Sequence, residues 1–479
     1  MYHPNLEEAI KLKGEGNLLP VYREINADLE TPVSAFLKIN LGGYSFLLES
    51  VEGGERLGRY SLIGTEPYKV ILTRSSDPVD PLTTVSSEMS HYKVVPIEGL
   101  PRFCGGAVGY LAYETASRFE RLPSPGKDPL GLPEALFMMT KTLLIFDHVT
   151  HKIKVLSHVA LDGDIETSYI QATRDIDELV RRLHAPLPGE PGAGTHQIKP
   201  SCSKPVSNFT KEGFEAAVNK IKNYIGSGEA IQVVLSQRMA QPTEASPFDI
   251  YRALRSVNPS PYMFFLDCKD FHIIGSSPEI LVRVENGTVT TRPLAGTRPR
   301  GQNPSEDAAL EHELRNDEKE RAEHIMLVDL GRNDIGRVSR PGSVEVSELM
   351  NVERYSHVMH LVTQVQGKLL DGLTSFDAMR ACFPAGTVSG APKIRAMEII
   401  AELEHEKRGP YAGAAGYFSF SGNMDMAIAI RTMVMSKGVA YTQSGCGIVY
   451  DSIPEAEYQE TLNKAQALLG AVRQAENVA

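Results

Sequence analysis

Apolar and polar positions follow regular periods in two long regions of the chain. In the first region, runs rich in β-branched and aromatic residues stand between turns, which is typical of strands. These runs cover 34–51, 68–73, 104–114 and 142–160, and a helical period follows over 165–183. The pattern predicts a set of strands that is closed by one helix.

The second region also mixes strand and helix periods. It opens with a helical period over 208–225, in which isoleucine, phenylalanine and valine share one face. We predict strands at 231–240, 262–268, 271–277, 281–296, 411–422, 426–436 and 439–450, and helices at 306–330, 375–380, 391–406 and 454–476. Hairpin signals such as Asn286–Gly287 favour antiparallel sheets. We therefore expect an α+β fold.

A stretch rich in proline, glycine and serine separates the two regions at 184–207. It has no apolar period and cannot bury a face, so we interpret it as a linker. The division predicts an N-terminal domain at 1–183 and a C-terminal domain at 208–479. Two units are expected because 479 residues exceed what one ordinary hydrophobic core serves.

Composition and charge exclude several classes of protein. The formal net charge of −11 disfavours binding to nucleic acid or to an anionic membrane surface. The N-terminus lacks a signal peptide, and no apolar run approaches the length of a membrane span. Five scattered cysteines form no CxxC pair, which favours a reduced, cytoplasmic protein. Because the overall charge repels anions, an anionic substrate would need local positive charge or a metal ion.

Two segments carry carboxylates at helical spacing. Glu320 and Glu323 are three residues apart, and so are Glu457 and Glu460, with Lys464 on the same helical face. Two such faces supply hard oxygen ligands and leave open positions, which suits Mg²⁺. By spacing alone, a solvated acidic face is the more ordinary interpretation, so the surrounding motifs must decide.

Those motifs resemble the chorismate-utilising enzymes, and within them anthranilate synthase component I. The matching blocks are GEAIQVVLSQR (228–238), IIGSSPE (273–279), RPLAGTRPRG (292–301), DEKERAEHIMLVDLGRND (317–334), FPAGTVSGAPK (383–393), GPYAGAAGYF (409–418), AIRTM (429–433) and SGCGIVYDSIPEAEYQETLNK (444–464). They extend through nearly all of 209–469. The resemblance implies two large, mainly antiparallel sheets packed face to face, with helices outside.

The resemblance also implies a metal site and a substrate site. Glu323 and Glu460 would bind Mg²⁺, and Glu320 and Glu457 would support the ion through water. The ion would neutralise the ring carboxylate of chorismate. The residues that would bind the substrate are Gly296, Thr297, Thr387, Tyr411, Arg431, Gly445, Gly447 and Lys464. Glycines allow close approach of the backbone, and successive N–H groups can hold an anion.

Three residues would take part in the chemistry by the same resemblance. His360 would be the general acid/base that helps the C4 hydroxyl leave, while Thr387 contacts the ring and Lys464 lies beside the metal-bound carboxylate. His324 and His357 are rivals for the role of His360. Each role has an ordinary alternative: His360 could be a histidine packed in the core, Arg431 a surface residue of a strand, and Gly445 and Gly447 could simply permit a turn.

Two positions discriminate among members of the family. Isochorismate and salicylate synthases resemble this chain but carry a lysine where Gln232 stands; they add water, which needs a base, whereas ammonia is already a nucleophile. Aminodeoxychorismate synthases carry a nucleophilic lysine where Ala295 stands. The sequence therefore predicts attack of ammonia at C2 of chorismate, followed by elimination of pyruvate to give anthranilate, the first step of tryptophan biosynthesis.

The N-terminal region contains LLES (47–50), and NPSPYMF (258–264) lies in the other region. Together they resemble a tryptophan feedback motif. The implied effector residues are Glu49, which would face the ammonium group, and Ser50, Pro261, Tyr262 and Met263. An ordinary strand with a polar edge is the alternative.

No glutaminase segment follows the last block, so we expect a separate glutamine amidotransferase subunit to supply ammonia within a hetero-oligomer. Two other functions remain open. One is an aminodeoxyisochorismate synthase that stops before pyruvate is lost. The other is an inactive subunit that only senses tryptophan or binds a partner.

Overall fold

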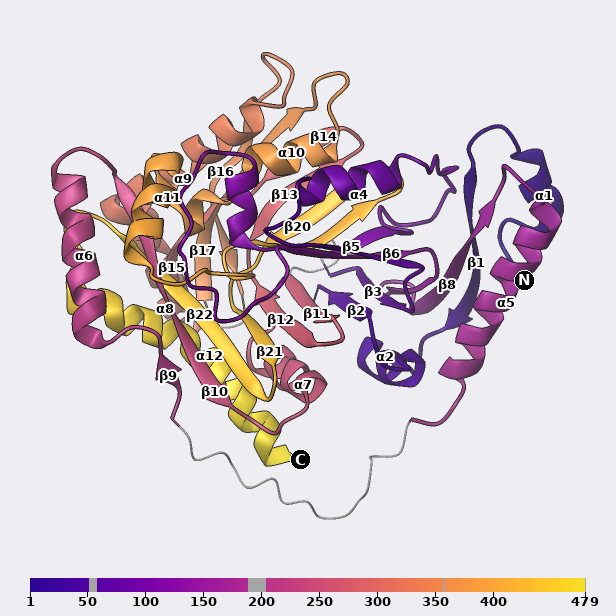
Figure 1. The fold of residues 1–479 in the computed structure, drawn as a ribbon, viewed down its shortest axis with the longest axis horizontal. Helices are drawn as coiled ribbons and strands as arrows, with labels where there is room; N and C mark the ends of the chain where they lie inside the picture. The colour runs from indigo at the N-terminus through magenta and orange to yellow at the C-terminus, as the bar shows by residue number, and fades with distance from the viewer. Residues whose placement is uncertain (51–57, 188–203, 356–357, 479) are drawn as a thin grey trace.

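Two large antiparallel sheets pack face to face in the computed structural model, which describes residues 1–50, 58–187, 204–355 and 358–478 (Figure 1). The first sheet runs in the order β1 (Leu18–Asn26), β8 (Lys152–Ala160), β7 (Leu143–Asp147), β3 (Tyr60–Thr65), β2 (Ser45–Glu49), β11 (Tyr262–Asp267), β12 (Phe271–Ser277), β21 (Thr432–Ser436), β22 (Val439–Ile448), β10 (Gln232–Pro242) and β18 (Gly390–Ala391), with β9 (Val206–Ser207) beside β10. The second runs β15 (Leu294–Pro299), β17 (Val358–Lys368), β14 (Thr288–Thr291), β13 (Ile280–Glu285), β20 (Met424–Ile428), β19 (Ala414–Ser419), β5 (Gly106–Leu111), β6 (Ala135–Thr140) and β4 (Lys69–Thr73), with β16 (Glu345–Arg354) beside β17. The α+β class and the two-sheet architecture are confirmed.

Strands from both sides of the predicted linker contribute to both sheets. In the first sheet β2 pairs with β11, so that Glu49 lies opposite Met263. In the second sheet β5 pairs with β19, so that Tyr110 lies opposite Ala415. Most of the predicted linker lies outside the described residues, although its last two residues form β9. The domain boundaries therefore stay a prediction, while the sheets themselves are shared.

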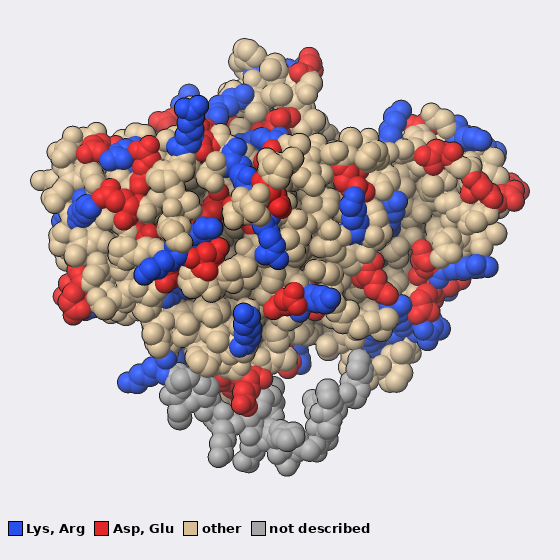
Figure 2. All heavy atoms as spheres, viewed as in Figure 1, with Lys and Arg blue, Asp and Glu red and all other residues tan. Residues whose placement is uncertain are grey.

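Helices cover the outer faces of both sheets. They are α1 (Leu6–Lys11), α2 (Pro32–Ile39), α4 (Pro81–Met89), α5 (Ile165–Leu183), α6 (Lys211–Gly226), α7 (Pro247–Val257), α8 (Pro304–Asn316), α9 (Glu318–Gly336), α10 (Ser375–Cys382), α11 (Lys393–Leu403) and α12 (Pro454–Val478), with the 3₁₀ turns η1 (Tyr113–Arg118) and η2 (Gly386–Val388). Among the described residues, none of the helices combines the length and apolar character needed to cross a bilayer. On the face that Figure 2 presents, acidic and basic side chains are interspersed.

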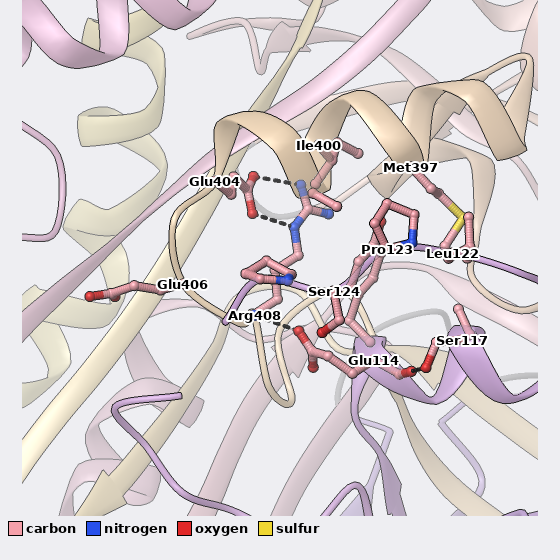
Figure 3. Close-up of a pocket in the computed structure, with 14 residues that line it drawn as sticks. Glu114, Ser117, Leu122, Pro123, Ser124, Met397, Ile400, Glu404, Glu406 and Arg408 are labelled. Carbon is pink, nitrogen blue, oxygen red and sulfur yellow. Dashed lines mark hydrogen bonds and ion pairs between the residues drawn. The ribbon is translucent and has the colours of Figure 1, made fainter. Parts of the chain in front are cut away.

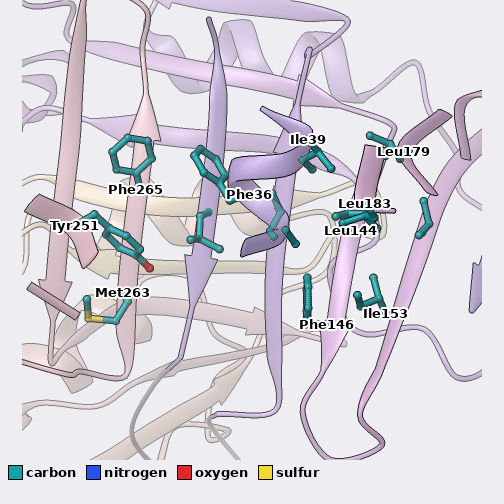
Figure 4. Packing of buried hydrophobic residues seen from close by; sticks show 14 of the residues in the cluster. Phe36, Ile39, Leu144, Phe146, Ile153, Leu179, Leu183, Tyr251, Met263 and Phe265 are labelled. Carbon is teal, nitrogen blue, oxygen red and sulfur yellow. The ribbon is translucent and has the colours of Figure 1, made fainter. Parts of the chain in front are cut away.

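The core has an inner layer between the sheets and outer layers beneath the helices. Phe46 and Phe264 of the first sheet meet Val108 and Tyr417 of the second in one buried cluster. On the far side of the first sheet, helices α2 and α5 pack onto the strands through residues such as Phe36 and Leu183 (Figure 4). Alternation along each strand separates the two layers, because successive side chains point to opposite faces.

Two predicted elements are wrong in detail. The segment 34–51, predicted as one strand, begins as helix α2, because Thr31 and Ser34 form a capping box and Pro32 occupies the first turn. The helix predicted over 306–330 is two helices, α8 and α9. They separate at Asp317, whose extended backbone (φ −70°, ψ 113°) lets its side chain cap the start of α9.

Several strands carry no clear sequence signal and were not predicted, among them β1, β6, β16 and β17. By contrast, the hairpin signal at Asn286–Gly287 is confirmed. Both residues have positive φ (49° and 74°) between β13 and β14. The predicted strand 426–436 divides into β20 and β21, which belong to different sheets. The chain therefore crosses from one sheet to the other at Ala429–Ile430–Arg431.

Candidate functional site

The candidate site is built on one face of strand β22. Gly445 and Gly447 point to the same side of this strand, because side chains alternate. Cys446 and Ile448 point the other way, into the cluster beneath α6 and α11. The two glycines therefore face away from those helices and leave a stretch of bare backbone on the opposite face.

Predicted metal ligands from two distant helices lie beside this bare backbone. On α9, Glu323 Oε1 accepts a hydrogen bond of 3.0 Å from Gln232 Nε2. The same amide nitrogen lies 2.4 Å from the place where a Cβ of residue 447 would stand. On α12, Lys464 Nζ contacts Glu460 Oε1 at 2.7 Å and donates to the carbonyl of Gly445 at 3.0 Å. Each of the two carboxylates therefore has a hydrogen-bond or ion-pair partner that lies at the Gly445–Gly447 segment of β22.

The supporting carboxylates, Glu320 and Glu457, both have a raised pKa. Burial is the main cause for Glu320, and the charge of Glu323 adds to it, while Arg298 opposes the shift. Burial also raises the pKa of Glu457, where Glu460 is the like-charged neighbour. Each helix therefore carries a pair of carboxylates whose mutual repulsion a divalent cation would relieve.

The charge of Lys319, in the first turn of α9, lowers the pKa of Glu457 on α12. The two helices are therefore within electrostatic reach of each other. In the described part of the chain, no three acidic, histidine or cysteine side chains form a ready-made metal cluster. Mg²⁺ requires only one or two carboxylates, because it keeps several waters and takes oxygens from an anionic ligand. The donor set fits that ion.

Arg431 is the cation of the site, and it stands where the chain crosses between the sheets. Its backbone is left-handed (φ 50°), and its carbonyl accepts a hydrogen bond of 3.0 Å from the amide of Ser276. Burial lowers the pKa of Arg431, opposed by Tyr411 and Glu460, which lie close to it. A non-glycine residue held at positive φ is strained, and such strain persists where surrounding structure fixes a side chain.

Tyr411 lies against β22 at Gly445. A Cβ at position 445 would stand 2.8 Å from the Tyr411 hydroxyl and 2.8 Å from the carbonyl oxygen of Leu235. Any side chain there would displace the ring, so glycine is required by packing. Arg431, Tyr411 and the two glycines together form a cationic, backbone-lined surface that can hold a carboxylate.

His360 lies on β17 between two neighbouring strands, opposite Thr297 of β15 and Glu353 of β16. Its Nδ1 is 2.9 Å from Thr297 Oγ1 and 3.2 Å from the carbonyl oxygen of Gly296. Burial, aided by the charge of Arg431, lowers the pKa of His360 to about 4. The imidazole is therefore neutral at pH 7. When Nδ1–H donates to the Gly296 carbonyl, Nε2 is left as a proton acceptor.

The rivals of His360 are placed differently. His324 is fully buried, and its Nε2 lies 2.5 Å from the Thr363 hydroxyl, in the packing between α9 and β17. Burial lowers its pKa to about 4. This is the ordinary position of a core histidine. His357 lies outside the described residues.

Gly296 also connects β15 to the metal ligands. Its φ is +74°, and a Cβ there would stand 3.3 Å from Glu320 Oε2. The glycine therefore lets the backbone that carries Thr297 approach the carboxylate pair of α9.

Thr387, in η2, has a buried hydroxyl that lies next to the carboxyl group of Glu279. It lines a small cavity of about 30 Å³ together with Glu279. Burial raises the pKa of Glu279 to about 8. A carboxyl group that stays protonated near neutral pH can donate a proton, so Glu279 joins the candidate residues. The sequence analysis did not single it out, although it lies in the IIGSSPE block.

A second, larger cavity of about 300 Å³ lies between the sheets. All five predicted effector residues line it, which brings LLES and NPSPYMF together from the two regions of the chain. It also contains residues that the sequence analysis missed, namely Arg59, Tyr60, Arg102, Phe103 and Tyr417. Three arginines line the cavity, of which Arg283 is paired with Asp425. Aromatic rings and arginines suit a flat ligand that carries a carboxylate.

The role predicted for the Glu49 carboxylate requires a correction. Its side chain accepts hydrogen bonds from Tyr251 (2.5 Å) and Arg255 (3.0 Å) of α7, on the outer face of the first sheet. The neighbouring Leu48 points into the inner layer, where it packs with the cluster between the sheets. The Glu49 carboxylate is therefore turned away from the cavity and already paired. What Glu49 offers a ligand is its backbone.

Comparisons with known proteins show the family of the chain. The family model described as chorismate binding enzyme matches residues 43–470. The chain is 48% identical to anthranilate synthase component 1 of Acetivibrio thermocellus over 490 residues, covering 99% of each chain, and 48% identical to that of Pseudomonas putida, covering 98% of this chain and 99% of the relative.

Among solved structures, anthranilate synthase component I from Streptococcus pneumoniae TIGR4 matches with a TM-score of 0.76 and 42% identity, over 86% of this chain and 92% of that one. The menaquinone-specific isochorismate synthase of Escherichia coli matches with a TM-score of 0.72 at 20% identity, over 98% of both chains. The second match supports the fold alone.

Proposed function

The chain belongs to the chorismate-binding enzymes, and from this premise we propose that it is the chorismate-using subunit of anthranilate synthase. It would convert chorismate and ammonia into anthranilate, pyruvate and water, and so open the branch to tryptophan. The observation that carries the proposal is that predicted ligands of two helices approach one stretch of β22. Gln232, the hydrogen-bond partner of Glu323, lies at Gly447, and Lys464, the ion-pair partner of Glu460, contacts the carbonyl of Gly445. Similarity to relatives of that name along almost the whole chain supports it further.

The proposed cofactor is Mg²⁺, which Glu323 and Glu460 would hold, with support from Glu320 and Glu457. When bound, the ion supplies positive charge for the ring carboxylate of chorismate. The ionised carboxylates of this chain would otherwise repel that group.

The enolpyruvyl carboxylate would bind beside Arg431 and Tyr411. Arg431 supplies the charge, and Tyr411, whose hydroxyl lies at Gly445, supplies a hydrogen-bond donor. Holding both ends of the substrate fixes C2 and C4 relative to the protein, which lowers the entropic cost of the reaction.

The proton transfers are assigned to His360. Ammonia attacks C2, the C4 hydroxyl must leave with a proton, and pyruvate is then eliminated as the ring becomes aromatic. In the absence of substrate, the imidazole of His360 is neutral at pH 7. A substrate with two carboxylates raises the pKa of a nearby imidazole, because negative charge favours the protonated form. His360 can then donate the proton to the leaving hydroxyl.

Gln232 supports amination over hydration. Its amide donates to Glu323 and carries no titratable group that could deprotonate water. Ammonia needs no such base. A neutral, hydrogen-bonded side chain at this position therefore suits an ammonia-using enzyme.

Tryptophan is the proposed inhibitor, and the cavity between the sheets is its proposed site. The cavity joins the LLES and NPSPYMF segments and carries Arg59 and Arg102 for a carboxylate. Strand β11, which lines this cavity, pairs with β12. In β12 the amide of Ser276 donates a hydrogen bond to the carbonyl of Arg431. A ligand that prefers one arrangement of these strands would change the affinity for chorismate.

Ammonia would come from a glutamine amidotransferase subunit in a cytoplasmic hetero-oligomer. The word component in the names of the relatives supports a partner. No residue of this chain is assigned to that contact.

One assay tests the proposal. The isolated chain is incubated with chorismate, Mg²⁺ and an ammonium salt at alkaline pH, and anthranilate fluorescence and pyruvate are followed. We expect both products in equal amounts. Accumulation of a non-aromatic amino acid without pyruvate would instead identify an aminodeoxyisochorismate synthase. Absence of turnover with tryptophan binding retained would identify an inactive sensing subunit.

A further inference from the structure

An ion pair between Arg408 and Glu404 is buried directly behind the candidate site. Their side chains are only 1% and 4% exposed. Arg408 Nε donates to Glu404 Oε2 at 2.8 Å, and Nη2 donates to Oε1 at 2.7 Å (Figure 3). Glu404 ends helix α11, and Arg408 lies in the turn that leads to Tyr411.

Arg408 also holds backbone next to two substrate-binding positions. Its Nη1 donates to the carbonyl of Val388 at 2.7 Å, one residue after Thr387. Its Nη2 donates to the carbonyl of Val234 at 2.8 Å. Val234 is the residue of β10 that pairs with Gly447 of β22. One guanidinium thus ties the Thr387 turn to β10, the strand that pairs with β22 at Gly447.

Glu404 extends the same contacts to the other glycine. Its Oε1 accepts hydrogen bonds from the amide of Ser236 (2.8 Å) and from the Ser236 hydroxyl (2.9 Å). Ser236 pairs with Gly445 on β22. The pair therefore touches the partners of both glycines.

The remaining contacts of Arg408 hold in place the turn that leads from Arg408 to Tyr411. The guanidinium lies 5.7 Å from the centre of the Tyr411 ring and 4.6 Å from that of Tyr113. The amides of Arg408 and Gly409 donate to the buried carboxyl of Glu114 at 2.7 and 3.1 Å. Glu114 belongs to η1, so the N-terminal region also anchors this turn.

A contribution to folding stability does not by itself explain why the Arg408–Glu404 ion pair is buried. Burying two charges costs several kcal/mol for each ion, and apolar residues of similar volume often serve as well. Here the guanidinium uses its planar geometry to reach one carboxylate and two carbonyls from different elements, which lysine cannot do. What these elements share is that each carries or adjoins a predicted substrate-binding residue.

We propose that Arg408, together with Glu404, is the positioning residue of the chorismate site. The pair sets the spacing between the Thr387 turn, the Tyr411 ring and the Gly445–Gly447 backbone, without touching the substrate itself. This inference rests on the proposed function. It predicts that loosening the pair weakens recognition of chorismate more than it weakens the fold.

The experiment compares two substitutions of the same kind. Arg408→Lys keeps the charge and removes the planar fork. Arg118→Lys is the matched control, because Arg118 of η1 also holds one carboxylate, Glu134, and backbone carbonyls of 74–77. None of those carbonyls adjoins a substrate-binding residue. Both proteins are assayed with chorismate, Mg²⁺ and ammonium salt, and their thermal unfolding is recorded.

For Arg408→Lys we expect kcat/KM for chorismate to fall by about 10- to 100-fold, since displacements near 1 Å in a site have such effects. The KM for ammonia and the inhibition by tryptophan should stay close to those of the unsubstituted chain. Arg118→Lys should lower the melting temperature by a similar amount and leave the kinetics unchanged. Unchanged kinetics for Arg408→Lys, or equal losses in both variants, would overturn the inference.

A milder variant keeps the test decisive should Arg408→Lys not fold. Ser236→Ala removes the hydroxyl's hydrogen bond to Glu404 Oε1 and the one that it accepts from Gln443 Nε2, and it leaves the ion pair in place. A smaller rise of the chorismate KM, with unchanged inhibition, supports the inference, and an unchanged KM refutes it. Failure of the unsubstituted chain to use chorismate would refute the proposed function instead, so the two failures are distinguishable.

Discussion

Gly447 offers a direct test of how closely the site is packed. Its backbone does not have positive φ, so an alanine can adopt its conformation without strain. The obstacle is a side chain, because a Cβ at this position would stand 2.4 Å from Gln232 Nε2 and 3.0 Å from its Cδ. Gly447→Ala must therefore push Gln232 away from the strand.

The size of the displacement follows from the contact. Ordinary van der Waals contact begins at 3.4 Å, so the amide nitrogen must move by about 1 Å. It would then leave Glu323 Oε1, to which it donates at 3.0 Å. The lost hydrogen bond costs about 0.5–1.5 kcal/mol of folding stability, and replacing glycine returns about 0.4–1 kcal/mol through the unfolded chain. We expect a nearly unchanged free energy of unfolding.

Activity should respond much more strongly. Glu323 is a proposed metal ligand, and a misplacement of about 1 Å can reduce turnover by about 100-fold. The assay is anthranilate formation from chorismate and ammonium salt, with chorismate and Mg²⁺ varied separately. Gly470→Ala on α12 is the control, because a Cβ there meets nothing within 4 Å. It should keep the activity of the unsubstituted chain.

A double-mutant cycle identifies the cause. If Gly447→Ala acts through Gln232, its effect should largely disappear in a Gln232→Ala background, because the displaced side chain is then absent. Wild-type kinetics for Gly447→Ala would refute the packing argument. Full additivity of the two substitutions would show that Gly447 acts on the substrate directly.

Four further outcomes are expected. Glu323→Gln should abolish anthranilate formation while thermal unfolding changes little; substantial turnover at saturating Mg²⁺ would remove Glu323 from the metal site. Ser50→Phe should fill the cavity of about 300 Å³ and relieve inhibition by tryptophan while kcat is retained, which an unchanged inhibition curve would contradict. His360→Met should slow the amination step in single-turnover experiments, and normal rates would reassign the proton donor. His158 is buried, and burial lowers its pKa from 6.5 to about 4, so the imidazole stays neutral in the folded protein. Unfolding below pH 6.5 therefore takes up a proton, and the free energy of unfolding falls as the pH drops toward 4. In urea titrations at pH 7 and pH 4.5, His158→Asn should remove up to about 3 kcal/mol of that pH dependence.

Local sequence determined the elements and the chemistry that each can carry. The spacing of Glu320 and Glu323 places both on one face of α9, whatever the rest of the fold does. Hairpin residues such as Asn286–Gly287 set their own turn, because only a few residues tolerate positive φ. The motif blocks identified the family, and the match of its model over 43–470 agrees.

Partnerships between distant residues were decided only by the order of strands in the two sheets. Gln232 meets Glu323 across 91 positions, and Arg408 meets Val234 across 174. No period along the chain encodes such a meeting. β17, which carries His360, was itself missed, although alternate residues along it are buried. Its place between β15 and β16 was decided by the tertiary structure.

The direction of single side chains also belongs to the tertiary structure. Glu49 stands in the predicted motif and lines the predicted cavity, yet its carboxylate points to Arg255 on the opposite face of the sheet. A strand offers each residue one of two faces, and a shift of one residue in register exchanges them. The resemblance of the motif blocks to a known family could therefore propose the residues of both sites, whereas helical spacing alone favoured a solvated acidic face. Which atoms face one another was fixed by long-range strand pairing, whose register depends on the packing of both sheets at once.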